Sequence, residues 1–288
     1  MKLLLAAAWL AGTAWAQPDP QAFDTGRDNH AGLTFSPDGQ SAYWVAWDGK
    51  WGSRAAGPRT IYTAQRTASG WSPPRPAAFS GSYSDGAPFV SPDGHWLYFV
   101  SDRPETAGED AGDGNIWRYR LHSDLHSEGA LEKLAINSAA AEYSPVVVAS
   151  GVLYFASARP GGLGQGDLYR AAPEGDGFQQ PENLGPAVNT ATGEWNLWVS
   201  PDESEMIFEA SSRPTNLSVP GDLYYSRQNN GGWHPAVPLT SLNTTHSDLL
   251  TRMHPDGVTL YFTQAPLGQH AELIRVSWRE HRPVSTNP

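Results

Sequence analysis

Hydrophobic positions in this chain come in short runs that are bounded by glycine, proline and aspartate. In the clearest example, an apolar segment at 87–90 is followed by Ser-Pro-Asp-Gly at 91–94 and then by an aromatic and β-branched run at 96–100. Proline presets φ for a turn and glycine accepts a positive φ, so 91–94 has the chemistry of a tight turn. Aromatic and β-branched runs are typical of strands. The pattern therefore predicts strand, turn, strand.

This unit occurs five times. The aromatic residue in the second strand of each copy recurs at intervals of 55, 56, 53 and 54 residues, and these residues are Trp44, Phe99, Phe155, Phe208 and Phe262. A period near fifty residues with several strands indicates a β-propeller, because one small sheet cannot bury both faces until its neighbours stack on it. We predict an all-β fold with five blades of four antiparallel strands, in one domain over residues 17–288. A six-bladed ring is the less favoured alternative, because we find no sixth copy of the unit.

The ends of the chain leave ring closure open. Residues 21–23 (Gln-Ala-Phe) resemble residues 77–79 (Ala-Ala-Phe) before the second repeat, so the N-terminal segment is one candidate for the outer strand of the last blade. Residues 276–279 compete for the same place.

The first 16 residues have the pattern of a secretory signal peptide. A single positive charge at Lys2 precedes an apolar run that ends in Ala14-x-Ala16. The run is shorter than the roughly 20 residues that span a membrane, and Pro18 follows it, so we expect cleavage after Ala16 and no membrane span. The chain has no cysteine, which excludes a lipid-bearing cysteine and disulfides. We expect a periplasmic or secreted protein.

Charge and motifs exclude several classes of function. The net charge is −11 and the chain has no run of lysine or arginine, so nucleic acid is not an expected partner. The sequence contains no cysteine nucleophile, no Gly-x-Ser-x-Gly elbow and no His-Glu-x-x-His motif. We expect no cofactor and a monomer.

Several repeated motifs carry a family resemblance. They are Ser-Pro-Asp-Gly at 36–39 and 91–94, Leu-Tyr-Phe-x-Ser at 97–101 and 153–157, Ser-x-Arg-Pro at 101–104, 157–160 and 211–214, and Gly-Asp-Leu-Tyr at 166–169 and 221–224. On these residues the chain resembles the WD40-like Pro-Asp repeat (PD40) propellers, a family that includes the propeller of the periplasmic protein TolB. The resemblance covers about residues 28–278 and implies a scaffold. The first and last repeats lack Ser-x-Arg-Pro, and the third lacks Pro-Asp-Gly.

Each repeat places one ionisable residue where its innermost strand is expected to begin, 13 or 14 positions before the strand aromatic. These residues are His30, Asp85, Glu142, Glu194 and Asp248. Around the mouth of a closed ring, such a set is a candidate ligand-binding site, since crowded carboxylates raise one another's pKa or bind a cation. Five-bladed glycosidases hold carboxylates in the same general location, so the four acids are the catalytic candidates if the protein is an enzyme. The favoured interpretation is structural, with each acid hydrogen-bonded to backbone of the adjoining blade.

Three tryptophans are candidates for sugar stacking. Trp47 and Trp51 lie in or beside the long loop 47–59, and Trp195 follows Glu194. Flat aromatic faces suit sugar rings, whereas most other aromatics fall on strand positions, where packing between blades is expected. We place ligand recognition on the face that carries the long Gly-rich loops.

Two further sets of charged residues have structural interpretations. We predict salt bridges from Arg159 to Asp167 and from Arg213 to Asp222. The acidic loop, with Glu105, Glu109, Asp110 and Asp113, is a weak calcium candidate, because its spacing does not match an EF-hand and a solvated loop is the simpler interpretation.

Two hypotheses of different classes follow. The first is an exported, non-enzymatic scaffold that binds a protein or a cell-envelope polymer. The alternative is a glycan-binding or glycoside-cleaving propeller that uses the four carboxylates.

Overall fold

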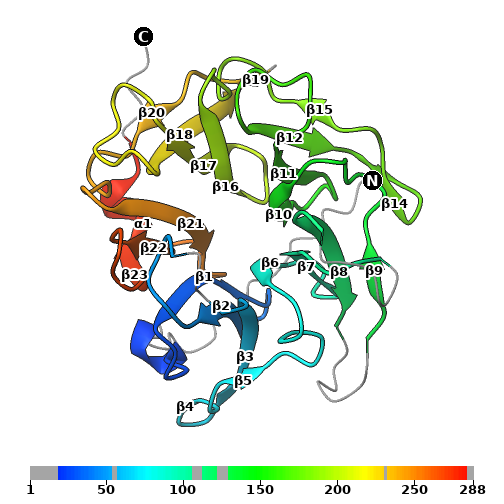
Figure 1. The fold of residues 1–288 in the computed structure, drawn as a ribbon, viewed down its shortest axis with the longest axis vertical. Helices are drawn as coiled ribbons and strands as arrows, with labels where there is room; N and C mark the ends of the chain where they lie inside the picture. Colours follow the sequence, from blue (N-terminus) through cyan, green and yellow to red (C-terminus); the bar gives the residue numbers. More distant parts are fainter. Residues whose placement is uncertain (1–18, 54–56, 106–111, 122–128, 230–231, 284–288) are drawn as a thin grey trace, which may run out of the picture.

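The computed structural model describes residues 19–53, 57–105, 112–121, 129–229 and 232–283. Within these ranges, five antiparallel sheets stand around a central axis (Figure 1), which confirms the predicted five-bladed propeller. The predicted signal peptide, residues 1–16, lies outside the described residues. No helix among the described residues is long and apolar enough to cross a membrane.

The strands follow the expected order in each blade. Blade 1 contains β1 (Asn29–Phe35), β2 (Ser41–Trp47), β3 (Thr60–Thr67), β4 (Gly70–Trp71) and β5 (Arg75–Pro76); blade 2 contains β6 (Asp85–Val90), β7 (Trp96–Ser101), β8 (Asn115–Arg120) and β9 (Leu131–Lys133). Blade 3 contains β10 (Glu142–Val147), β11 (Leu153–Ser157), β12 (Asp167–Ala171) and β15 (Glu182–Asn183), with a side hairpin of β13 (Pro173–Glu174) and β14 (Gly177–Phe178). Blade 4 contains β16 (Gly193–Val199), β17 (Glu205–Ser211), β18 (Asp222–Asn229), β19 (Gly232–Trp233) and β20 (Val237–Pro238); blade 5 contains β21 (Ser247–Met253), β22 (Thr259–Ala265) and β23 (Glu272–Ser277).

The Ser-Pro-Asp-Gly turns form as expected between the first and second strands. In blade 2 the Ser91 hydroxyl donates to Asp93 Oδ1, which also accepts the backbone N–H of His95 at 2.9 Å. Gly94 has a φ of 72°, a conformation that costs glycine little. The turn is therefore closed by its own side chains.

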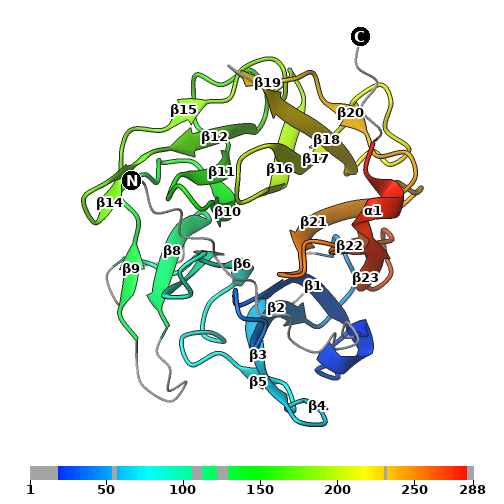
Figure 2. The same ribbon diagram turned by 180° about the vertical axis from the view of Figure 1, so that it is seen from behind.

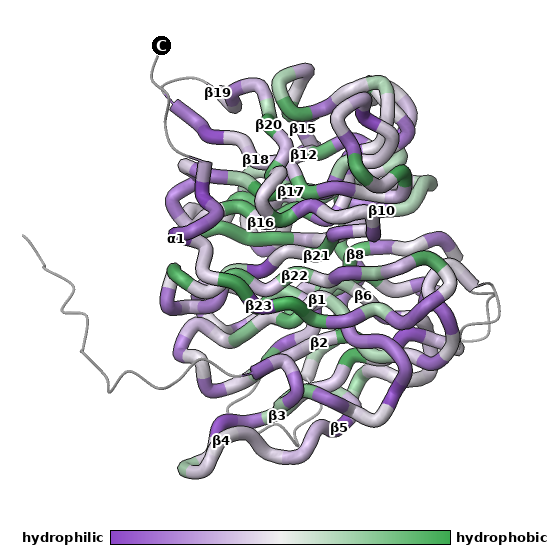
Figure 3. The backbone as a smooth tube through the Cα atoms, turned by 90° about the vertical axis from the view of Figure 1, so that its left-hand side faces the viewer, coloured by the Kyte–Doolittle hydropathy of each residue, from purple (hydrophilic) through white to green (hydrophobic). Residues whose placement is uncertain are grey.

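Hydrophobic packing joins each blade to the next. Trp44 packs with residues of blade 5, Trp117 belongs to a cluster shared by blades 1 and 2, and Tyr154 packs in a cluster shared by blades 3 and 4. Green, hydrophobic segments run along part of β23 in the side view (Figure 3). The prediction that strand aromatics serve packing between blades is confirmed at these positions.

Blade 5 has three strands among the described residues, and the ring closes without a fourth. Residues 20–23 form a short 3-10 helix, η1 (Pro20–Phe23), so the interpretation of this segment as an outer strand is wrong. Its Phe23 is buried against Trp44 and Trp71, with ring centroids 5.2 Å from each. At the other end of the chain, α1 (Trp278–His281) follows β23 directly (Figure 2).

Blades 5 and 1 are joined by hydrogen bonds as well as by packing. His30 N–H donates to the carbonyl of Ala271 at 3.0 Å, and Ala271 N–H donates to Asn29 Oδ1 at 2.8 Å. Within the described ranges, no strand from residues 19–28 or 278–283 joins the sheet at the other end, and packing together with these polar contacts joins blades 5 and 1.

Candidate binding site at the mouth of the central channel

All five innermost strands share a local distortion two residues after their ionisable residue. The pairing of each inner strand with its neighbour shifts register there, as at a β-bulge, and the residue at the shift has a positive φ. The five residues are Gly32 (63°), Ala87 (48°), Ser144 (44°), Asn196 (39°) and Leu250 (52°). Only the first is glycine, so four side chains are held in a conformation that L-residues rarely adopt. We call these positions the bulge ring.

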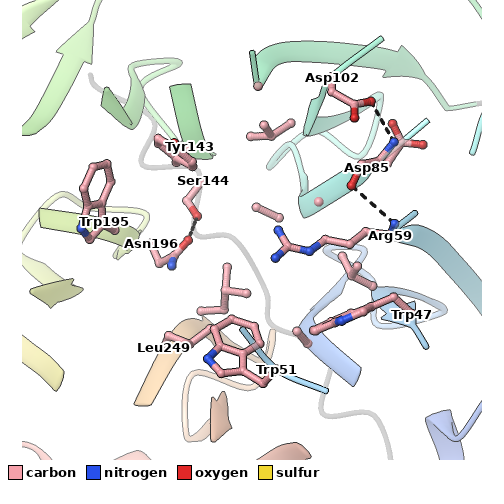
Figure 4. Close-up of a pocket in the computed structure, with 18 residues that line it drawn as sticks. Trp47, Trp51, Arg59, Asp85, Asp102, Tyr143, Ser144, Trp195, Asn196 and Leu249 are labelled. Atoms are coloured by element: carbon pink, nitrogen blue, oxygen red, sulfur yellow. Dashed lines mark hydrogen bonds between the residues drawn. The ribbon is translucent and has the colours of Figure 1, made fainter. Parts of the chain in front are cut away.

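A cavity of about 420 Å³ opens at this ring. Its volume lies in the range of about 300–1,000 Å³ that is usual for small-ligand sites. The walls come from all five inner strands and from the long loop between β2 and β3 (Figure 4). The face with the long loops, where we expected recognition, is therefore hollowed.

The three tryptophans singled out from the sequence all line this cavity. Trp47 is buried, with its ring centroid 5.9 Å from that of the half-buried Trp51. Trp51 is anchored to blade 5 by its backbone, which donates to the carbonyl of Gln269 and accepts from Gly268 N–H.

Trp195 stands against Tyr143 in an edge-to-face contact, at 5.1 Å between ring centroids. Gly166 and Gly193 make room for its indole, since a Cβ at either position would collide with the ring. The cavity is thus aromatic on several sides, and the indole positions are set by backbone contacts and by glycines.

Arg59 extends its guanidinium into the cavity (Figure 4). The group lies 5.3 Å from the centre of the Trp47 ring. The backbone of Arg59 is fixed by Asp85 N–H, which donates to its carbonyl at 2.9 Å. The residue as a whole is exposed, and burial of its guanidinium group among the cavity walls lowers its pKa. Sequence reasoning placed Arg59 at the end of a long loop but did not single it out.

A polar chain runs along the wall opposite Arg59. The Ser144 hydroxyl donates to Asn196 Oδ1 at 2.6 Å, and Asn196 Nδ2 donates to the carboxyl group of Glu209. Burial raises the pKa of Glu209 from its ordinary 4.5 to about 7, with Asp222 and Asp248 adding to the rise and the Asn196 hydrogen bond opposing it. The chain therefore contains a buried carboxyl group that takes up a proton near neutral pH.

Three of the four acids that the sequence analysis placed at the start of the innermost strands are buried, and each is bound by an arginine of its own blade. Asp85 bonds Arg103 at 2.6 Å, Glu142 bonds Arg159 at 3.2 Å, and Glu194 bonds Arg213 at 2.8 Å, with each carboxylate fully buried. The arginines belong to the repeated Ser-x-Arg-Pro motif. We call these three pairs the anchors.

A hydroxyl group adds a hydrogen bond to each anchor, although the second carboxylate oxygen of Glu142, Oε2, is buried without a partner. Ser80 donates to Asp85 at 2.6 Å, Ser138 to Glu142 at 2.5 Å and Thr190 to Glu194 at 2.6 Å. Even so, burial raises the pKa of Asp85, because desolvation outweighs the stabilisation of its charge by Arg103 and the serines.

The other two ionisable residues at the start of an innermost strand, Asp248 and His30, lack an arginine partner. Asp248 accepts hydrogen bonds from Thr244 and, at 3.1 Å, from Gln264, and burial raises its pKa. His30 Nε2 lies 2.9 Å from the hydroxyl of Thr25, and burial lowers its pKa. Of the five ionisable residues at the start of the innermost strands (His30, Asp85, Glu142, Glu194 and Asp248), only Asp85 borders the cavity.

The predicted salt bridges Arg159 to Asp167 and Arg213 to Asp222 are wrong. Both arginines bind the ring acids instead. Asp167 accepts backbone N–H groups of Leu163 and Gly164, and Asp222 accepts those of Leu217 and Ser218. These aspartates therefore close their own loops through backbone contacts, which a pattern of charges does not reveal.

The calcium candidates are only partly described. Glu109 and Asp110 lie outside the described residues. Glu105 is exposed and has its carboxylate 3.6 Å from Lys133, and Asp113 is exposed. The described part of the chain contains no group of three or more potential metal-ligating side chains.

Arg252 is a second arginine that the sequence did not single out. It projects from β21, is almost fully buried, and donates to the carbonyls of Leu197 and Thr251 at 3.0 and 2.9 Å. Burial lowers its pKa to about 10. Because Leu197 follows Asn196, this charge lies next to the bulge ring, and no sequence signal distinguishes it from a surface arginine.

Comparisons with known proteins show a fold but no family. No family model matches the chain, and no curated protein matches it. Among solved structures, TolB from Acinetobacter baumannii is similar over 87% of this chain and 52% of its own length, at 17% identity and a TM-score of 0.55. The chain thus spans about half the length of that TolB.

Two other solved structures are matched over nearly their whole length. The match to BT0996, solved as an RGII complex, covers 92% of each of the two chains, at 11% identity and a TM-score of 0.61. A glycoside hydrolase is covered to 91%, against 92% of the present protein, at 12% identity and a TM-score of 0.60. At these identities the likeness concerns architecture alone. The chain has the fold of a TolB-like β-propeller.

Proposed function

We propose that this protein is an exported binding propeller that holds a cell-envelope polymer in the tryptophan-lined cavity and does not cleave it. The observation that carries the proposal is a contrast in accessibility between the tryptophans that line the cavity and the four acids at the start of the innermost strands. The cavity presents the half-buried indoles of Trp51 and Trp195, supported by the buried Trp47, whereas the side chains of Asp85, Glu142, Glu194 and Asp248 are fully buried in contacts with their own blades.

The burial of these four carboxyl groups argues against hydrolysis by them. Glycoside cleavage uses two carboxyl groups that flank the bond, about 5–10 Å apart and open to the substrate. The three anchor carboxylates are each neutralised by an arginine and bonded to a hydroxyl, so none is placed to transfer a proton to a bound ligand.

A saccharide polymer suits the cavity because of its walls. Flat indole faces stack on the apolar faces of sugar rings, and polar groups such as Asn196 and Ser144 can reach ring hydroxyls. The partly exposed Trp51 and Trp195 are the stacking platforms, while the buried Trp47 supports them.

Calorimetric titration of residues 17–288 with neutral and acidic cell-wall oligosaccharides tests this proposal. We expect binding that Trp51→Ala weakens at least tenfold and that Trp233→Ala leaves unchanged. Trp233 is a matched control because it is half-buried on blade 4, packs edge-on against Tyr154 and does not border the cavity. Equal effects of the two substitutions would contradict the proposal.

Export is tested separately. Residues 1–16 support it, and the mass of the protein recovered outside the cytoplasm should correspond to a chain that begins at Gln17. Recovery of the intact chain from the cytoplasm would contradict export.

Glycoside cleavage is the second candidate. Asp102 borders the cavity, and Glu209, whose pKa burial raises to about 7, is linked to the cavity wall through Asn196 without lining the cavity itself. If the protein is a hydrolase, Glu209→Gln should abolish release of reducing ends from the bound oligosaccharide. A wild-type protein that binds without releasing reducing ends supports the binding proposal instead.

A further inference from the structure

Arg59 differs from the arginines of the anchors and from Arg252. Arg103, Arg159 and Arg213 form ion pairs with buried carboxylates, and the buried Arg252 donates to backbone carbonyls. No carboxylate of the described residues lies within ion-pair distance of Arg59, whose guanidinium instead faces Trp47. Its donors are therefore directed into a cavity rather than at the protein.

Arg59 places a positive charge in the cavity of a protein that is acidic as a whole. The chain has a net charge of −11, yet Arg59 is the single cationic side chain among the described residues that line the cavity. A guanidinium presents a fixed fork of N–H donors that matches an oxyanion. Within low-dielectric aromatic walls, this attraction is stronger than it would be at an open surface.

The neighbouring groups favour an anion of low charge. Asp102 also borders the cavity, with one carboxylate oxygen held by Ser84 N–H at 2.9 Å. A doubly charged phosphate would face one cation and one carboxylate, so repulsion from Asp102 offsets part of its attraction to Arg59. A single carboxylate is better matched to this pair of charges.

The shape of the walls favours a sugar as the carrier of that carboxylate. Trp195 and Asn196 lie across the cavity from Arg59, and Trp51 packs beside Trp47, the indole that Arg59 contacts (Figure 4). A sugar acid has an apolar ring face for an indole, hydroxyls for Asn196 and Asp102, and a carboxylate at one edge. A peptide carboxylate offers no comparable flat face to the indoles.

We propose that the cavity recognises a saccharide unit that carries one carboxylate, with the carboxylate bound by Arg59 and the ring stacked on Trp51 or Trp195. This inference rests on the proposed function and specifies its ligand chemistry. Two sources supply such a unit: hexuronic acids in polysaccharides, and the lactyl carboxylate of muramic acid in peptidoglycan.

Paired titrations at low salt test this inference. The first arm compares trigalacturonic acid with the neutral trisaccharide obtained by reducing its carboxyl groups. The second compares the N-acetylglucosaminyl-N-acetylmuramic acid disaccharide with chitobiose. Glucose 6-phosphate and an acidic tripeptide are added as single probes. The variants are Arg59→Gln, Arg59→Lys and, as control, Arg170→Gln, which removes an exposed arginine on blade 3 that pairs with Glu182.

We expect an acidic saccharide from one arm to bind at least about tenfold more tightly than its neutral counterpart, in keeping with a charge-assisted hydrogen bond. Arg59→Gln should abolish that preference, Arg59→Lys should retain part of it, and Arg170→Gln should retain all of it. The preference should also fall as salt is raised. The arm that shows the effect identifies the source.

Three results would overturn the inference. If neutral and acidic saccharides bind equally, or if Arg59→Gln leaves the preference intact, the carboxylate assignment fails while saccharide binding stands. If glucose 6-phosphate or the acidic tripeptide binds best, the ligand class is wrong. If no saccharide in either arm binds to the wild-type protein, the proposed function fails together with this inference.

Discussion

The anchors and the cavity wall use the same residue, arginine, in opposite ways. In blades 2, 3 and 4 the arginine of Ser-x-Arg-Pro lies against a fully buried carboxylate of its own blade, as Arg213 does with Glu194 at 2.8 Å. On the cavity wall, Arg59 points into an open space and contacts an indole. A charge that is satisfied inside a blade holds that blade in shape, whereas one left facing a cavity is available to a ligand.

The comparison also separates two kinds of acidic residue. Each anchor acid is bonded to an arginine, whereas Asp248 and Glu209 are buried without an arginine partner and lie near other acids that add to the rise in their pKa values. The following substitutions test this distinction, in order of decreasing effect on the free energy of unfolding.

The largest effect is expected for Glu194→Gln. The substitution preserves the size of the side chain but leaves the buried Arg213 without its counterion, and breaking a buried pair in this way costs about 3–5 kcal/mol. Urea denaturation of the mature protein measures it. A loss below about 1 kcal/mol would show that the anchors are not structural.

Glu209→Gln should act with a strong dependence on pH. The pKa of Glu209 is 4.5 in its ordinary state and about 7 in the fold, so the proton it holds stabilises the native state fully below pH 4.5, and this stabilisation is lost as pH rises to 7. At 1.36 kcal/mol per pKa unit, the wild type loses about 3 kcal/mol from this group over that range. The neutral glutamine loses none of it.

Denaturation of wild type and Glu209→Gln at pH 5 and pH 8 measures this difference. We expect the variant to gain stability relative to the wild type at pH 8 compared with pH 5. A difference between the two proteins that is constant with pH would contradict the raised pKa.

Asp248→Asn should cost much less than Glu194→Gln. Asp248 is bonded to Thr244 and Gln264 and has no arginine partner, and an asparagine can accept from Thr244 while donating to the Gln264 amide oxygen. We expect a loss of about 1 kcal/mol or less in the same denaturation assay. A cost equal to that of Glu194→Gln would remove the distinction between the two kinds of acid.

Arg59→Gln should have the smallest effect on stability. Its guanidinium makes no ion pair among the described residues, so the free energy of unfolding should change by less than about 0.5 kcal/mol, as for ordinary surface substitutions. Thermal denaturation checks this directly. A large destabilisation would show that Arg59 is itself an anchor.

Much of the fold could be predicted because it repeats. The aromatic spacing and the Ser-Pro-Asp-Gly turns are local patterns, and five copies of them fix the number of blades. Closure of the ring could not be predicted in the same way. Residues 21–23 resemble residues before another blade, yet the burial of Phe23 against Trp44 and Trp71 places them in a 3-10 helix.

The candidate site was only half predictable. Trp47, Trp51 and Trp195 stand out in sequence by residue type and position, and all three border the cavity. The partner of each arginine depends instead on which strand lies beside it, so Arg159 and Arg213 were paired with the wrong aspartates. The importance of Arg59 comes from what is absent around it in the described residues, and no sequence motif records that.

The bulge ring has a consequence for how this architecture acquires new specificities. Its five residues share one distortion of the backbone, and four of them (Ala87, Ser144, Asn196 and Leu250) line the cavity, while the anchors that hold the inner strands use other residues. Alanine, serine, asparagine and leucine thus already occupy equivalent positions in a single chain. The same scaffold therefore accepts different side chains at these points, and its ligand preference can change one blade at a time without a change in the strands beneath.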